Sequence, residues 1–164
     1  PYNNIQAIML DPTCSGSGMI NRLESQQHML KQQDKKERLV QLQQLQWSLL
    51  DHAFQCPTVE KVIYSTCSIF IEENEEIVIK ALKKYGETFQ LIHILPQWKR
   101  RGQSIEPHLP DQLAKKLIRA DPYKDKEIGN GFFVACFQRI YHNNVKKRKI
   151  IQPPQDRSKK IQKK

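Results

Sequence analysis

Short runs of hydrophobic residues along the chain predict β-strands. Residues 5–10 form a nearly continuous apolar run that stops at Asp11-Pro12, which is typical of a strand buried on both faces of a parallel sheet. A loop over residues 14–18 follows directly. We predict three further strands, over residues 59–64, 89–94 and 132–140.

Two stretches have the spacing of apolar residues that predicts an amphipathic helix. In residues 37–54 the apolar face includes Leu45 and Leu49, and the polar residues 20–36 before it are expected to form a loop or a frayed helix. The second stretch, residues 72–85, opens with acidic residues, which suit the helix dipole. The long segment from residue 96 to residue 128 is predicted to be irregular, because it combines four prolines with scattered charge.

The order of these elements is strand, helix, strand, helix, strand, long loop and strand, which indicates half of an open α/β sheet. Ligands bind such sheets outside the carboxyl ends of the strands. Cys14 and Cys67 both lie in turns directly after a predicted strand. If these strands are parallel neighbours, the two thiols meet at one edge of the sheet. We also expect residues 5–10 to form an exposed apolar edge strand.

Length and composition suit one domain that does not span a membrane. The chain has 164 residues, of which 38% are hydrophobic, and no apolar run approaches the length of a membrane span. It begins without Met and shows no signal peptide. We therefore expect a piece of a longer protein, with a domain over residues 1–141 and a tail over residues 142–164. The sequence does not indicate an oligomeric state.

Most of the net charge of +10 lies near the end of the chain. Residues 146–164 contain nine basic residues and one acidic residue, Asp156, so the rest is nearly neutral. A segment with so few apolar residues is expected to be disordered on its own. Its charge predicts an arm that binds nucleic acid, a nuclear-import signal, or both. A solvated tail without a partner is the alternative.

The cysteines favour neither a zinc site nor disulfides. No two have C-x-x-C spacing and no cluster of histidines accompanies them, so we expect no metal. Without a secretory signal, the thiols are expected to stay reduced. Free cysteines are usually small core residues, and we predict this for Cys56 and Cys136. Cys14 and Cys67 lie instead in polar turns.

The sequences of these two turns are similar to motifs of the Nop/Sun family of RNA 5-methylcytosine methyltransferases. Residues 11–18, Asp-Pro-Thr-Cys-Ser-Gly-Ser-Gly, resemble the family's D-P-P-C-S-G-x-G, with Thr13 in place of the second proline. Residues 64–68, Tyr-Ser-Thr-Cys-Ser, resemble its Y-S-T-C-S. Thr13, with Gly18-Met19 after it, is most similar to the branch that methylates large-subunit ribosomal RNA.

Further matches follow in register, so that the resemblance covers residues 5–140. The helix around residues 45–53 resembles the family's intervening helix. Glu73-Asn74-Glu75 matches its E-N-E helix start, and residues 131–135, Gly-Phe-Phe-Val-Ala, match its G-F-F-[VI]-A strand. The resemblance implies the C-terminal half of a Rossmann-like class I methyltransferase fold: parallel strands with helices and a terminal antiparallel strand.

The same resemblance implies transfer of a methyl group from S-adenosylmethionine to C5 of a cytosine in RNA. C5 is too electron-poor to take the methyl group directly, but a thiolate that adds to C6 makes C5 nucleophilic. In the family the thiol of the T-C turn, here Cys67, is this nucleophile. The thiol of the D-P-x-C loop, here Cys14, assists product release. Asp11 is implied to bind at the junction of cofactor and target base, with a turn-capping role as the alternative.

The sequence leaves alternatives for the pKa of the Cys67 thiol and for the role of the glycines in the Cys14 loop. The helix that follows Cys67 would lower the pKa of its thiol through the helix dipole, whereas the acidic run Glu72–Glu76 would raise it. Gly16 and Gly18 are compatible with a flexible turn or with close approach of a flipped nucleotide. Phe132 and Phe133 are expected in the core.

The chain lacks the family's glycine-rich A-P-G-G-K cofactor loop and the acidic residues that hold ribose and adenine. We therefore expect it to be inactive alone, without tight binding of S-adenosylmethionine. The alternative is a non-catalytic RNA-binding or ribosome-assembly protein with a degenerate methyltransferase domain, although both intact thiol motifs favour the enzyme. A DNA cytosine methyltransferase would use Cys14 as the nucleophile, and the Thr66-Cys67 turn favours RNA. Ribosomal RNA as substrate implies the nucleus, and within it the nucleolus.

Overall fold

The computed structural model of the chain describes residues 4–19, 32–124 and 129–141. Strands and helices alternate through most of this range. In chain order they are β1 (Ala7–Leu10), α2 (Gln32–Gln55), β2 (Lys61–Thr66), α3 (Glu75–Tyr85), β3 (Phe89–Leu91), α4 (Asp111–Ala114), β4 (Ile118–Ala120) and β5 (Phe132–Arg139).

The strands form one mixed sheet. Its order is β1-β2-β5-β3, and β4 also pairs with β5. β1 and β2 are parallel, whereas β5 is antiparallel to β2, β3 and β4. The strands β1 to β4 therefore run in one direction and β5 runs in the other. This confirms the predicted α/β sheet of parallel strands with a terminal antiparallel strand.

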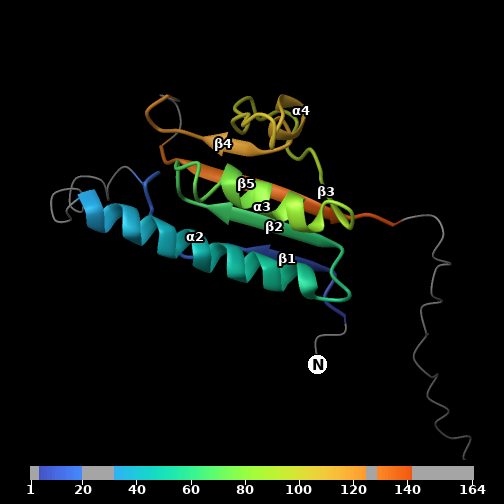
Figure 1. Ribbon diagram of the computed structural model, residues 1–164. Helices are drawn as coiled ribbons and strands as arrows, with labels where there is room; N and C mark the ends of the chain where they lie inside the picture. The colour runs from blue at the N-terminus through green and yellow to red at the C-terminus, as the bar shows by residue number, and fades with distance from the viewer. Residues whose placement is uncertain (1–3, 20–31, 125–128, 142–164) are drawn as a thin grey trace, which may run out of the picture.

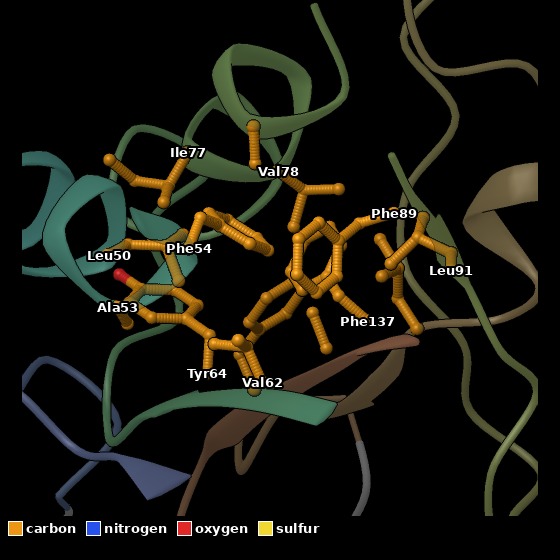
Figure 2. Close-up of a cluster of buried hydrophobic side chains, with 14 of the residues drawn as sticks. Leu50, Ala53, Phe54, Val62, Tyr64, Ile77, Val78, Phe89, Leu91 and Phe137 are labelled. Atoms are coloured by element: carbon orange, nitrogen blue, oxygen red, sulfur yellow. The ribbon is translucent and has the colours of Figure 1, made fainter. Parts of the chain in front are cut away.

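Helices α2 and α3 lie on one face of the sheet and enclose the core against it (Figure 1). The ring of Phe54 in α2 lies 4.7 Å from Tyr85, 4.8 Å from Phe89 and 5.1 Å from Phe137, measured between ring centroids. Figure 2 shows Phe54, Phe89 and Phe137 facing one another between the helices and the sheet. Pairs of this kind contribute about 0.5–1.5 kcal/mol beyond their buried area, so the cluster fixes α2 and α3 on the sheet.

The buried stripe of α2 differs from the predicted one. Leu50, Ala53 and Phe54 are buried as expected, and Gln46, one turn earlier, joins them at 0% exposure. Leu45 and Leu49 are 45% and 40% exposed, so their predicted burial is wrong. The helix is rotated so that the side chain of Gln46, rather than those two leucines, faces the inside of the molecule.

The predicted burial of the first strand on both faces is also wrong, whereas its prediction as an edge strand is confirmed. In the described residues β1 pairs only with β2. Its side chains alternate between exposed and half-buried, and Met9 is 74% exposed. Ile8 and Leu10 pack against the core. Only the face of β1 that is turned toward α2 is covered, which explains the alternation.

Two short elements lie within the segment predicted to be irregular. Helix α4 and strand β4 fall between residues 96 and 128, of which residues 125–128 lie outside the described residues. Helix α2 also begins at Gln32, earlier than predicted, and β3 ends at Leu91, three residues before the predicted end. No helix in the described ranges is both long and apolar enough to cross a membrane.

Candidate active site

The parallel pairing of β1 and β2 brings the two predicted catalytic cysteines together. Leu10 of β1 pairs with Tyr64 of β2, so the loops that follow the two strands leave the sheet side by side. The sulfur atoms of Cys14 and Cys67 lie 3.0 Å apart, and both side chains are half-buried. The expectation that the thiols meet at one edge of the sheet is confirmed, and their catalytic roles stay predictions.

The glycines of the Cys14 loop allow close backbone contacts. Gly16 has a φ of 68°, a conformation that glycine adopts without strain. The N–H of Gly18 donates to the carbonyl of Cys67 at 2.9 Å, and the N–H of Gly131 donates to the carbonyl of Gly18 at 2.7 Å. A Cβ atom on Gly18 would lie 2.5 Å from the carbonyl oxygen of Gly131. The loop therefore docks on the start of β5, and a side chain at Gly18 would prevent this.

Serine hydroxyls join the two loops beside the thiols. The Oγ atoms of Ser17 and Ser68 lie 3.0 Å apart, and those of Ser15 and Ser17 lie 3.1 Å apart, both within hydrogen-bond distance. The N–H of Ile69 donates to Ser17 Oγ at 3.0 Å. Ser17 and Ser68 are buried. These hydrogen bonds hold the two loops in one arrangement instead of leaving them to move independently.

Glu73 is a completely buried carboxylate that holds the Cys14 loop. Its Oε1 accepts hydrogen bonds from the N–H of Ser15 at 2.9 Å and from Gln46 Nε2 at 2.8 Å. Its Oε2 accepts one from Ser15 Oγ at 2.6 Å. The hydroxyl of Tyr64 donates to the backbone carbonyl of Glu73 at 2.6 Å. Glu73 thus connects the start of α3, helix α2 and the residue next to Cys14.

Asn74 makes the corresponding contacts with the Cys67 loop. Its Oδ1 accepts a hydrogen bond from Thr66 Oγ1 at 2.6 Å, and its Nδ2 donates to the carbonyl of Ser68 at 2.9 Å. These partners are the two neighbours of Cys67 in the sequence. Asn74 is 0% exposed and occupies the N-cap position of α3, but its side chain makes no capping hydrogen bond to the helix.

The third residue of this segment, Glu75, forms a buried ion pair with Arg119 of β4. Arg119 Nη2 and Nε donate to the two carboxylate oxygens of Glu75 at 2.8 Å and 3.0 Å. Arg119 Nη1 donates to the carbonyl of Ile69, just past the Cys67 loop, at 2.8 Å. Two acidic residues of the run near Cys67 are therefore bound to partners: Glu75 is paired with a cation and Glu73 is fully hydrogen-bonded.

Asp11 lies at the same edge of the sheet, at the carboxyl end of β1. Its Oδ1 accepts one long hydrogen bond from Ser65 Oγ, at 3.3 Å, and the residue is exposed. An exposed carboxylate with this single weak contact can bind a cationic or hydroxyl-bearing ligand. Its cofactor-binding role stays a prediction.

Burial and the neighbouring thiol affect the protonation of Cys14. Burial and the hydrogen bond with Cys67 raise the pKa of the Cys14 thiol to about 12. Cys14 is therefore a neutral thiol near pH 7, which can donate its proton toward the sulfur of Cys67.

Cys136 is buried as predicted, and Cys56 is half-buried against the core. In the described ranges no group of three or more His, Cys, Asp or Glu could hold a metal ion.

Sequence reasoning missed three groups of this site. The sequence places Glu73 and Asn74 in an acidic helix start and in the E-N-E match, but it does not predict that their side chains are buried. It also missed Arg119, which stands inside a strand of three residues. The available signal was Gln46, a polar residue within the apolar stripe of α2 that donates to Glu73. Phe133 is in the core as predicted, and Phe132 is half-buried against Trp98, with 5.2 Å between ring centroids.

Comparisons with known proteins show the family of the chain. The family model described as 16S rRNA methyltransferase RsmB/F matches residues 3–138. The chain is 40% identical over 138 residues to a 28S rRNA (cytosine-C(5))-methyltransferase of Mus musculus, which covers 84% of this chain and 28% of that protein. It is 39% identical over 147 residues to a 25S rRNA (cytosine-C(5))-methyltransferase of Schizosaccharomyces pombe, covering 86% of the chain and 30% of that protein.

A solved structure supports the fold. A methyltransferase homolog protein from Pyrococcus horikoshii superimposes with a TM-score of 0.60 at 24% identity, covering 84% of this chain and 40% of that one. The chain spans only 28% and 30% of the length of the two curated relatives named above. The match of the family model over most of the chain confirms the resemblance seen in its motifs: the chain belongs to the RsmB/F family of rRNA methyltransferases, known also as the Nop/Sun family.

Proposed function

We propose that this chain is the thiol-bearing part of an S-adenosylmethionine-dependent RNA cytosine-C5 methyltransferase. The observation that carries the proposal is the pair of sulfur atoms, Cys14 and Cys67, 3.0 Å apart at the carboxyl edge of the sheet. This is where α/β sheets bind their ligands. Methylation at C5 of cytosine needs a thiolate that adds to the base and a way of releasing it afterwards.

In this proposal Cys67 is the nucleophile. Its sulfur adds to C6 of the cytosine, a C6–S bond forms, and electron density moves to C5. S-adenosylmethionine, when bound, supplies the electrophilic methyl group. After methylation the C5 proton leaves to a base, the C5–C6 double bond re-forms and the C6–S bond breaks, which frees Cys67. Cys14, held as a neutral thiol by its raised pKa, is suited to donate a hydrogen bond to the departing sulfur of Cys67.

In this proposal Asp11 is the residue of the chain that contacts the cofactor. Its exposed carboxylate stands at the end of β1, beside Ser65 and on the same edge as the thiols. A negative charge at this place suits a sulfonium or ammonium group of the cofactor. We expect the rest of the cofactor site from residues outside this chain, so the 164-residue chain alone should neither methylate RNA nor bind S-adenosylmethionine tightly.

We further propose ribosomal RNA of the large subunit as the substrate. The printed names of the two relatives above are those of 28S and 25S rRNA (cytosine-C(5))-methyltransferases. The nucleus, and within it the nucleolus, is then the expected place of action. The basic residues between Lys146 and Lys164 fit both a nuclear-import signal and an RNA-binding arm. A non-catalytic assembly protein is disfavoured because both thiols stand in intact motifs.

Single substitutions in the full-length protein that contains this chain test the roles of the thiols. Cys67→Ala should reduce methyl transfer to background and abolish the covalent RNA adduct. Cys14→Ala should instead accumulate the adduct, because elimination stalls. Incorporation of labelled methyl groups and denaturing gels measure the two quantities, and Cys56→Ala is the matched control that should behave like the unchanged enzyme.

Two results would refute parts of this proposal. Covalent RNA adducts that persist in Cys67→Ala and vanish in Cys14→Ala would show that Cys14 is the nucleophile, as expected for a DNA cytosine methyltransferase. Absence of both methyl transfer and adduct in the unchanged protein, with RNA binding intact, would support the non-catalytic alternative.

A further inference from the structure

The two loops that bear the thiols are held by neighbouring residues at the start of α3. Glu73 receives three hydrogen bonds, and two of these come from Ser15, the residue after Cys14. Asn74 binds Thr66 and Ser68, on either side of Cys67. Two cysteines that are far apart in the sequence are therefore positioned from two consecutive residues.

Burial makes these contacts sensitive to the exact position of each loop. Glu73 and Asn74 are both 0% exposed. A buried carboxylate or amide that loses its hydrogen bonds destabilises the fold, because water cannot replace the lost partner. Displacement of either loop would leave one of these side chains unsatisfied. The structure therefore resists movements that change the position of Ser15 or Thr66.

The contacts are not those of ordinary helix capping. An asparagine at an N-cap usually accepts a hydrogen bond from a backbone N–H in the first turn of its own helix. Asn74 stands at the N-cap of α3 without such a bond, and its side-chain oxygen accepts from Thr66 instead. The side chain thus serves the Cys67 loop and not the helix.

We propose that Glu73 and Asn74 are positioning residues that together set the separation of the Cys14 and Cys67 thiols. Glu73 acts through Ser15, and Asn74 acts through Thr66 and Ser68. Glu73 and Asn74 are joined by one peptide bond. The Cys14 loop and the Cys67 loop are therefore both fixed relative to the same short segment before α3. The proposal rests on the proposed function for its catalytic meaning, but the separation of the thiols can be measured without RNA or cofactor.

A trivalent arsenical, phenylarsine oxide, tests this separation directly, since it binds tightly only where two thiols reach one arsenic atom. The test uses the whole chain with Cys56 and Cys136 replaced by Ala, so that only the thiol pair remains. Cys14→Ala in this background defines the binding of a single thiol. We expect Glu73→Ala and Asn74→Ala to weaken capture at least tenfold relative to the parent. Glu72→Ala is the matched control: Glu72 is the exposed neighbour in the sequence and should bind like the parent.

A second readout separates positioning from general loss of structure. Burial is the largest cause of the raised pKa of Cys14, and the hydrogen bond with Cys67 is the second. Separation of the thiols should therefore lower this pKa from about 12 by the part that the contact contributes. The ultraviolet absorbance of the thiolate against pH measures this shift in variants whose circular dichroism and melting temperature match the parent. An unchanged titration in a variant that has lost arsenical capture would contradict the proposal.

Variants on the loop side keep the test decisive if an alanine at Glu73 or Asn74 prevents folding. Thr66→Val removes the hydroxyl that Asn74 accepts from, at nearly constant shape, and Ser15→Ala removes one that donates to Glu73. Each should weaken arsenical capture severalfold. Folded Thr66→Val and Ser15→Ala chains that capture the arsenical as tightly as the parent would overturn the proposal. They would leave the proposed methyltransferase function untouched, because that is judged by adduct formation on RNA.

Discussion

At the scale of single residues, the pairing of Glu75 with Arg119 places two opposite charges where water does not reach them. Their side chains are 0% and 3% exposed. Loss of one partner leaves the other charge buried without compensation. Arg119→Met should therefore lower the free energy of unfolding by about 3–5 kcal/mol, measured by urea denaturation.

Two further variants check the cause. The double substitution Arg119→Met with Glu75→Leu should be more stable than Arg119→Met alone, because no unpaired charge remains. Lys115→Met removes one partner of an exposed pair, whose side chains are 67% and 64% exposed, and should change stability by less than about 1 kcal/mol. Equal losses at the buried and the exposed pair would contradict this explanation.

Burial also makes the stability of the protein depend on alkaline pH. It raises the pKa of the thiols of Cys14 and Cys136 and, with the nearby charge of Glu73, that of the Tyr64 hydroxyl. A group whose pKa is higher in the folded than in the unfolded state stabilises the fold below its unfolded pKa, and this contribution is lost as the pH rises. For Cys14 the window runs from 9.0 to about 12.

We therefore expect the urea midpoint to fall as the pH rises above 9.0, the ordinary pKa of a cysteine thiol. The double variant Cys14→Ala with Cys136→Ala should show a shallower fall, because it lacks two of the groups with raised pKa. Identical slopes in the parent and the double variant would show that these thiols do not cause the loss.

At the same scale, the sequence locates the candidate catalytic and cofactor-binding residues better than the buried residues that contact their loops. Cys14, Cys67 and Asp11 stand in turns after strands, and such turns can be read from local pattern. The buried contacts of Glu73 and Asn74 could not be read in this way, although their E-N-E motif could. A carboxylate near a helix start looks solvated unless its distant partners, Ser15 and Gln46, are known, and tertiary structure alone brings those partners to it.

At the scale of elements, the edge strand β1 exposes an apolar side chain beside unpaired backbone groups. Met9 is 74% exposed, and in the described residues β1 pairs on one side only. Edges of this kind promote association with other chains. Met9→Lys should reduce aggregation at micromolar concentration, as measured by light scattering, and should change stability by no more than about 0.5 kcal/mol.

Ile8 offers the matched comparison on the same strand. Its side chain packs against the core, so Ile8→Lys should destabilise the protein and increase aggregation. Equal effects of the two lysine substitutions on stability and aggregation would contradict the difference in burial between the two faces of β1.

The accuracy of the predicted elements depended on their length. The four strands that carry apolar runs and the two long helices were predicted within a few residues. Helix α4 and strand β4, four and three residues long, are too short to give a period, and β4 carries Arg119 at its centre. The burial of this arginine depends on Glu75, which lies 44 residues away in the sequence. A local pattern therefore could not have indicated a strand there.

At the scale of the whole molecule, the positive charge of residues 146–164 gives a prediction about RNA binding; this segment lies outside the described residues. Contacts with phosphates release counterions, each changing the salt dependence of single-strand binding by about 0.7 on a double-logarithmic plot. Removal of residues 142–164 should weaken RNA binding for all sequences and flatten this slope. Filter binding over a range of salt concentrations measures it.

A tail of equal length with every Lys and Arg replaced by Gln is the control for charge. It should behave like the truncated chain, and the choice of cytosine should not change, because phosphate contacts position an RNA without specifying its sequence. A truncated chain that retains the salt slope of the parent would show that the tail takes no part in binding.

The reversed strand β5 has a consequence for the order in which the protein can fold. In the described part of the chain, β2, β3 and β4 do not pair with one another, and each pairs with β5. Before residues 132–139 have emerged from the ribosome, the described strands can form no strand pair other than the parallel pair of β1 and β2. Gly131, on which the Cys14 loop docks, lies directly before β5 and emerges together with it. The described sheet therefore cannot be built one strand at a time during synthesis. Strands β3 and β4 can join it only after β5, which lies between them and β2, has been synthesised.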